Sequence, residues 1–164
     1  MTPPRAAAIL GLLAALGALY GLASTPAFAL ARTDIPELQW TTRESVMAAI
    51  GTPNGVNLFQ LQTGPLEDRI RALPGVASAT VAVSLPDTIT VQIQEREAIL
   101  DWVIGDSHFL VDRDGVIFAS LAAGDDAVVT LPAVFDSRPE SAALRVGAVL
   151  DPVDLDAATR LASL

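Results

Sequence analysis

Two pairs of neighbouring acidic residues are the groups in this sequence best suited to chemistry. Asp112 and Asp114 stand two positions apart before Gly115, and Asp125 is followed directly by Asp126. Carboxylates at such spacing could coordinate calcium or share a proton in acid/base catalysis. The same residues are typical of tight turns and solvated loops, in which Asp enters the turn and Gly adopts a positive φ. We interpret both pairs as structural, and we predict no catalytic residue and no metal site.

His108 is the single histidine, and the chain has no cysteine. Disulfides, thiolate zinc sites and cysteine nucleophiles are therefore excluded, and a histidine-based metal site lacks its second imidazole. We expect His108 to be a half-exposed residue on a strand, and we expect Trp102 and Phe109 to lie in a core. The sequence thus predicts a protein that is not an enzyme, with no cofactor and no small-molecule substrate.

The charge balance excludes another class of partner. The 164 residues include ten arginines, no lysine and 19 acidic residues, which gives a net charge of −9. Residues 1–33 carry two of the arginines and no acid, so residues 34–164 have a net charge of −11. A nucleic-acid backbone would be repelled by that field, so we expect no nucleic-acid partner.

An apolar run near the N-terminus predicts contact with a membrane. Residues 6–23 read AAAILGLLAALGALYGLA, 18 residues without a charge, which as a helix would span about 27 Å. We expect a single transmembrane helix at 6–23, with residues 1–5 as a cytoplasmic tail and 24–33 as a connector. The alternative is a signal peptide cleaved at Ala27-Phe28-Ala29, just before Leu30.

Gly17 and Gly21 lie four residues apart within this run. Two small residues at that spacing share one helix face and let a second transmembrane helix approach closely. We predict a helix-packing role for the two glycines, against the simpler possibility that the spacing follows from the abundance of Gly and Ala.

Residues 34–96 predict a small α+β domain of order β-α-α-β-β. The first strand is expected at 35–40, although Pro36 weakens it, and Thr41 and Glu44 have the spacing of a capping box that begins a helix. That helix is expected to bury Val46, Met47 and Ile50. A second helix, from about residue 63 to 73, places Leu66, Ile70 and Leu73 on one face.

Two alternating segments complete this domain, at residues 76–85 and 88–94. In the second, Ile89, Val91 and Ile93 alternate with polar residues, and in the first Ala77, Ala79, Val81 and Val83 alternate likewise. Each strand should therefore bury one face only. The expected result is a three-stranded sheet with two helices on one face and water on the other.

Residues 97–164 predict the start of an antiparallel β-rich domain. Strands are expected at 98–104, 108–112 and 116–119, joined by tight turns at Gly105-Asp106 and Arg113-Asp114-Gly115. A helix is expected from about Asp154, with one apolar face formed by Leu155, Ala158, Leu161 and Ala162.

Several strings in this sequence resemble a known family. These strings are NLFQL (57–61), ALPGVASATV (72–81), LPDTITVQIQER (85–96), FLVDRDGVIF (109–118) and LPAVFD (131–136). Together with the order β-α-α-β-β, they resemble the POTRA domain and the following β-rich domain of the FtsQ/DivIB bacterial cell-division proteins. The chain stops within its last helix, and by comparison with that family we expect it to be truncated at the C-terminus.

The resemblance implies a non-enzymatic, single-pass scaffold of the divisome that links division proteins to septal peptidoglycan synthesis. Its N-terminus would lie in the cytoplasm and its bulk outside the cytoplasmic membrane, at the division septum. The implied partners are other bitopic division proteins, of the FtsB/DivIC and FtsL kinds, and indirectly the septal peptidoglycan synthase.

Two other functions stay open at this point: a POTRA-bearing secretion or assembly component, and a periplasmic binding domain released by signal cleavage. In each case the sheet of residues 34–96 has edges, and a free edge can accept a partner strand. The predicted edge strand carries Val76, Ser78, Thr80, Ala82 and Ser84.

Overall fold

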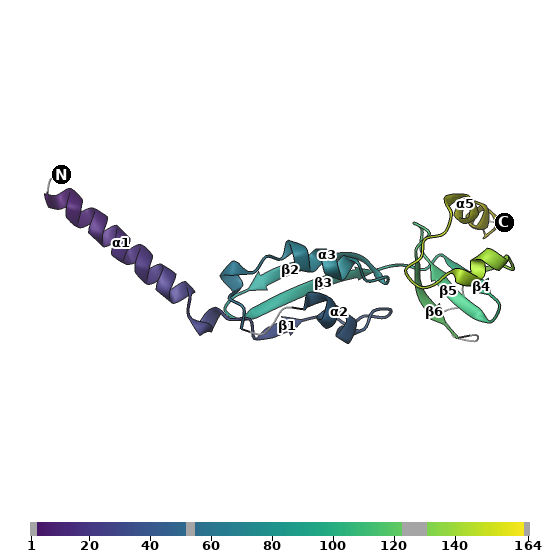
Figure 1. The fold of residues 1–164 in the computed structure, drawn as a ribbon, viewed down its shortest axis with the longest axis horizontal. Helices are drawn as coiled ribbons and strands as arrows, with labels where there is room; N and C mark the ends of the chain where they lie inside the picture. Colours follow the sequence, from purple (N-terminus) through teal and green to yellow (C-terminus); the bar gives the residue numbers. More distant parts are fainter. Residues whose placement is uncertain (1–2, 52–54, 123–130, 163–164) are drawn as a thin grey trace.

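A computed structural model describes residues 3–51, 55–122 and 131–162. It contains an N-terminal helix, a three-stranded sheet with two helices, and a four-stranded sheet with a C-terminal helix. The three parts follow one another along the chain, and the N-terminal helix extends away from the sheets (Figure 1).

The N-terminal helix α1, Pro3–Ala23, contains the predicted apolar run, and its residues 7–22 are all exposed. By length and hydropathy, no helix within the described parts of the chain qualifies as able to span a membrane. The membrane-spanning role of 6–23 therefore stays a prediction. A short 3-10 helix, η1 (Pro26–Phe28), follows α1.

The first sheet has the predicted order of elements. Its strands are β1 (Arg32–Asp34), β2 (Val76–Ser84) and β3 (Thr88–Glu95), with β3 in the middle. Strand β1 runs parallel to β3, and β2 runs antiparallel to it. The β-α-α-β-β topology is confirmed, and β1 begins inside the predicted connector.

The position predicted for the first strand, residues 35–40, is wrong. Pro36 has no N–H to give to a sheet, and the backbone N–H groups of Gln39, Trp40 and Thr41 donate instead to the carboxylate of Glu95. The main chain of this segment is thus satisfied by one side chain at the end of β3. The sheet pairing falls on the three residues before it, Arg32–Asp34, which lie opposite residues 88–90 of β3.

Two helices lie against this sheet: α2 (Arg43–Ile50) and α3 (Gly64–Arg71), with the 3-10 helix η2 (Leu58–Gln60) between them. The capping residue of α2 is Thr42 rather than Thr41, since the Thr42 side chain accepts the N–H of Ser45. Helix α2 ends at Gly51, whose φ of 56° favours glycine.

The helices bury one face of the sheet, and of the residues that the alternation placed on this face of β2, Ala79 and Val81 are buried whereas Ala77 and Val83 are exposed. The core contains Leu30, Val46, Ile50, Leu58, Leu66, Ile70, Val76, Ala79, Val81, Ile89 and Val91. Met47 was expected in this core but is 44% exposed. On the opposite face of β3, Gln92 and Gln94 are exposed.

The second sheet consists of β4 (Leu100–Ile104), β5 (Ser107–Val111), β6 (Ile117–Leu121) and β7 (Ala133–Phe135), in the order β6-β5-β4-β7. The three-stranded meander is confirmed. The prediction of a wholly antiparallel sheet is wrong, because β7 pairs with β4 in parallel. Strand β7 lies on the side of β4 opposite to β5, and it runs in the same direction as β4.

Helix α5 (Pro152–Ala162) and the 3-10 helix η3 (Pro139–Ala143) follow this sheet. Trp102 and Phe109 are buried, as expected. The core of this part contains Leu100, Trp102, Phe109, Val111, Ile117, Leu150 and Ala158. Only part of the predicted apolar face of α5 is used: Ala158 is buried and Leu155 packs against the core, whereas Leu161 is 68% exposed.

Candidate functional site

Strand β2 forms one edge of the first sheet, because β3 pairs with β2 on one side and with β1 on the other. The nine residues of β2 make it the longest strand among those described. A strand edge of that length presents a row of backbone donors and acceptors.

The register shows which backbone groups of β2 face this open edge. In an antiparallel pair, alternate residues exchange both hydrogen bonds with the partner strand, and the residues between them point their N–H and C=O away. The N–H of Val81 donates to Oε1 of Glu67 at 2.9 Å, so Val81 points away from β3. Ala79 and Val83, two positions to either side, face the edge in the same way.

The residues named from the sequence lie on this edge strand, but the backbone groups that face the edge belong to the residues between them. Ser78, Thr80, Ala82 and Ser84 lie on β2, but their backbone groups pair with β3, opposite Gln94, Gln92, Thr90 and Thr88. Val76 is fully buried in the core. A β-bulge between Val76 and Ser78 shifts the phase, since Ala77 has no partner in the register. Whether a partner binds to β2 stays a prediction.

A cavity of about 260 Å³ lies where β2 begins, at the junction of the two sheets. Ala77 and Ser78 line it on one side, and Asp112 and Asp114 line it on the other. Arg96 crosses the junction: its Nε donates to the carbonyl of Pro74 at 3.1 Å, and its Nη1 pairs with the carboxylate of Asp112. The start of β2 therefore lies next to a polar cavity that contains the ion pair between Arg96 and Asp112.

The two aspartates at this junction have structural roles that can be stated. Asp112 is buried, and its Oδ1 accepts the backbone N–H groups of Asp114 and Val116 at 2.9 Å each. Gly115 follows with a φ of 79°. This is the tight turn that the sequence predicted. Asp125 and Asp126 lie outside the described residues.

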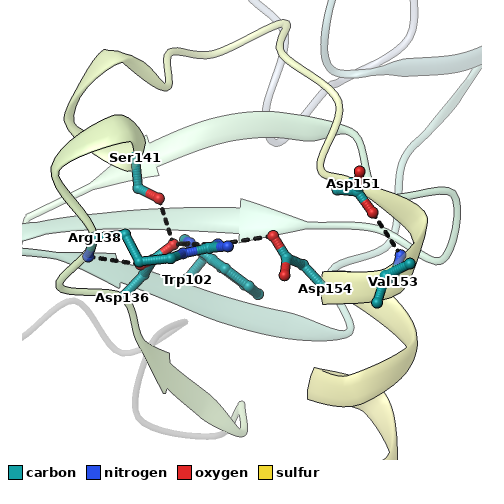
Figure 2. Close-up of polar contacts among 7 residues, drawn as sticks. All are labelled: Trp102, Asp136, Arg138, Ser141, Asp151, Val153 and Asp154. Carbon is teal, nitrogen blue, oxygen red and sulfur yellow. Dashed lines mark hydrogen bonds and ion pairs between the residues drawn. The ribbon is translucent and has the colours of Figure 1, made fainter.

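A second polar cluster joins β4, β7, η3 and α5 (Figure 2). At its centre the carboxylate of Asp136 accepts hydrogen bonds from the side chains of Trp102, Arg138 and Ser141. Nη2 of Arg138 lies 2.8 Å from both Asp136 Oδ2 and Asp154 Oδ2. Through Arg138, the end of β7 is tied to the first turn of α5.

The hydrogen bonds of this cluster shift two pKa values. Those from Arg138 hold the pKa of Asp136 well below its usual range, and the bond from Ser141 acts in the same direction. The carboxylates of Asp136 and Asp154 raise the pKa of Arg138. Because the Asp136 carboxylate accepts hydrogen bonds from several side chains, we interpret it as a structural residue that holds these elements together, not as a catalytic acid.

Comparison with known proteins relates residues 34–96 to a domain family. The family described as "POTRA domain, FtsQ-type" matches residues 34–96. Residues 34–96 form an FtsQ-type POTRA domain. The open edge of β2 and Glu67, which binds the N–H of Val81, both belong to this POTRA domain. Asp112 and the Asp136 cluster lie after it.

Three relatives extend the similarity beyond the POTRA domain, and each is named "Cell division protein FtsQ". The chain is 36% identical to the protein of Mycobacteroides abscessus over 96 residues, 58% of this chain and 31% of the relative. It is 32% identical to that of Mycobacterium leprae over 66% of this chain and 32% of the relative. For that of Geotalea daltonii the identity is 30%, over 63% of this chain and 38% of the relative.

Over more than half of its length, the chain is therefore similar to proteins named Cell division protein FtsQ. The chain spans about a third of the length of these curated relatives. Among the described residues, no group of three or more His, Asp or Glu side chains is placed to hold a metal ion.

One contact after the POTRA domain involves His108 and was not foreseen from the sequence. Its ring is mostly buried, and Nδ1 lies 2.7 Å from Oδ2 of Asp101. Asp101 is fully buried on β4, and its Oδ1 has no hydrogen-bond partner among the described residues. His108 lies on β5 and is partly exposed, as expected, and the antiparallel register brings it opposite Val103, two residues from Asp101.

Sequence reasoning missed both Glu67 and Asp101. Glu67 looked like one of several outward-facing charges of α3, and its contact with β2 depends on how α3 crosses the sheet. Asp101 lies between Leu100 and Trp102 on β4. An isolated acid inside an apolar run could have indicated the contact with His108, because a charged group in a buried strand needs a partner.

Proposed function

We propose that the protein is a non-enzymatic, single-pass membrane scaffold of the divisome, linking bitopic division proteins to septal peptidoglycan synthesis. The observation that carries this proposal is the FtsQ-type POTRA domain with an open β2 edge, in a chain similar to proteins named Cell division protein FtsQ. The function of the scaffold is to bind other proteins, so its relevant chemistry is backbone hydrogen bonding at that edge.

The membrane anchor in this proposal is the apolar segment of α1. Residues 6–23 contain no charged side chain, and the helix from Pro3 to Ala23 is 21 residues long. Helical residues with large exposed apolar side chains, such as Leu10, Leu19 and Leu22, are at least 60% exposed here. Lipid would cover those side chains.

Gly17 and Gly21 would allow this anchor to pack against the transmembrane helix of a neighbour. Apart from the adjacent residues and the nearby backbone of α1 itself, a Cβ atom added at either position would meet no heavy atom of the described residues within 4 Å. The surface around both glycines is therefore open for another helix. Bitopic partners of the FtsB/DivIC and FtsL kinds would supply such helices.

The open edge of β2 is the proposed contact outside the membrane. Strand addition draws its affinity from main-chain hydrogen bonds and its specificity from side chains next to the added strand. Ala79, Val81 and Val83 present the backbone groups for this contact, and the peptidoglycan synthase would be reached indirectly through the bound partners.

Membrane extraction and imaging test the two parts of the proposal. A fluorescent fusion of the full chain should remain with membranes in alkaline carbonate and should be enriched at midcell in dividing cells. Release by carbonate, with a mature mass that begins at Leu30, would identify a cleaved signal peptide. Retention in membranes without midcell enrichment would favour a different POTRA-bearing assembly protein.

A further inference from the structure

The backbone donor at the centre of the open edge is already occupied. The N–H of Val81 is bound by the carboxylate of Glu67, which reaches across from α3. Ala79 and Val83 have no such cover among the described residues. An incoming strand must therefore displace Glu67 before it can pair with the middle of β2.

The other charged side chains of α3 described here contact groups outside β2. Arg69 donates to the carbonyl of Ile50 at 2.8 Å, and Arg71 pairs with Asp68. Glu67 itself is half-buried, next to the buried Leu66. It is the charged group of α3 that contacts β2, and no arginine of this helix neutralises it in the contacts described.

The side-chain directions determine what an added strand would place near Glu67. Val81 is 4% exposed and points to the helix-covered face. In a β-pair, the residue directly opposite another projects its side chain to the same face. The residue opposite Val81 would thus point toward α3, where the displaced carboxylate of Glu67 lies.

We propose that the β2 edge accepts an extended segment of a partner protein with a lysine or arginine opposite Val81, and that Glu67 selects that basic residue. This inference rests on the proposed docking at β2 and adds the chemistry of the partner. Before binding, Glu67 blocks the edge against indiscriminate strand addition. After binding, the partner's carbonyl takes the Val81 N–H and the basic side chain pairs with the released carboxylate.

A second copy of this chain fits the edge poorly. Residues 34–164 carry a net charge of −11. Pairing of two β2 edges would bring two Glu67 carboxylates to the same contact, and like charges facing each other across strands are destabilising. The partner segment is therefore expected to come from a different protein.

Peptide binding to the full chain in detergent micelles tests this inference. The probes are two capped nonapeptides of alternating valine and threonine, identical except for a central lysine or glutamate. The lysine peptide should bind the unmodified chain about fivefold more tightly, the scale of a partly exposed ion pair. Glu67→Gln should reduce the preference to within about twofold, and Glu67→Lys should reverse it.

The matched control is Asp68→Asn, which removes one negative charge from the adjacent position of α3. It should leave the preference for the lysine peptide intact. Glu67→Gln keeps an oxygen that can accept the Val81 N–H, so it should retain the fold, which circular dichroism checks. Amide exchange at Val81 reports whether a peptide occupies the edge.

The outcomes separate this inference from the proposed function. Binding of both peptides at β2 without a preference, or a preference unchanged in Glu67→Gln, would overturn the role of Glu67 and leave the docking site standing. Failure of both peptides to protect Val81 in every variant would overturn the docking site and the inference with it. Self-association of Glu67→Gln through β2 would make a second copy the occupant and overturn the basic partner.

Discussion

The two sheets bury their strands in different ways. In the POTRA domain, β3 alternates: Ile89 and Val91 are buried, whereas Gln92 is exposed. In the second sheet, four successive residues of β4, Leu100 to Val103, are all at most 4% exposed. The first sheet thus has one wet face, and the middle of the second is covered on both.

The two regions also differ in their buried acidic residues. The buried carboxylates among the described residues are Asp101, Asp112 and Asp136, and all three lie after the POTRA domain. Each has a cationic or histidine partner: His108, Arg96 and Arg138 respectively. The POTRA core contains apolar side chains. Apolar burial therefore stabilises the first region, whereas the second region also depends on buried carboxylates and their partners.

The largest effect should come from a charge in the POTRA core. Ile89 has no exposed surface, so Ile89→Asp would bury an unpaired carboxylate and lower the free energy of unfolding by about 3–5 kcal/mol. Gln92→Asp, three residues later on the wet face, should change it by less than about 0.5 kcal/mol. Circular dichroism melts of both variants make the measurement, and equal melting temperatures would contradict the assignment of faces.

A smaller effect, specific to the second region, should follow from Asp136→Asn. The variant loses charged hydrogen bonds to Arg138, which should cost about 2 kcal/mol at neutral pH. The pKa of Asp136 is lowered in the folded state. Its ionised form therefore adds stability above the usual aspartate pKa of about 4, and that stability is lost as the pH falls toward the lower folded-state value.

The difference between Asp136→Asn and the unmodified protein should accordingly shrink below about pH 3. NMR amide signals of β4 and β3 follow the two regions separately during acid titration. We expect the β4 signals to be lost at a higher pH than those of β3. Simultaneous loss would show that the two sheets unfold as one unit and would remove the proposed contrast between them.

The regions also differ in how much of them the sequence predicted. The alternation of Ile89, Val91 and Ile93 is a local pattern, so β3 and its buried face could be predicted. The position of β1 could not, because parallel pairing of residues 32–34 depends on the distant Thr88 and on the Glu95 carboxylate that binds the following segment. Topology was predictable from local periodicity, and register was not.

The candidate site shows the same limit on a finer scale. The sequence identified β2 as an edge, but the bulge at Ala77 puts Val76 out of phase with Ser78 and the residues after it. A bulge adds one residue without a change in composition or hydropathy, so the alternation alone does not reveal it. The contact between Glu67 and the N–H of Val81 could not be predicted either, because it depends on how α3 crosses β2.

The smallest effect should come from the exposed ion pair of the first sheet. Arg32 lies 2.8 Å from Asp87, and its side chain is 66% exposed. The hydrogen bond from Arg32 lowers the pKa of Asp87, and a second bond from Thr88 acts in the same direction. Exposed pairs of this kind contribute little to stability because water and salt screen them.

In Arg32→Gln, the pKa of Asp87 should rise toward its usual value but stop short of it, because the Thr88 bond remains. By linkage, any loss of stability should be full above the usual aspartate pKa and should fade as the pH falls toward the lower folded-state value, and it must decrease with added salt. The measurements are an NMR titration of the Asp87 carboxyl group and thermal melts at pH 3 and pH 7, each in low and high salt. A melting temperature lowered equally at both pH values would contradict an electrostatic contribution, and would mean that the aliphatic part of Arg32 packs on β3 instead.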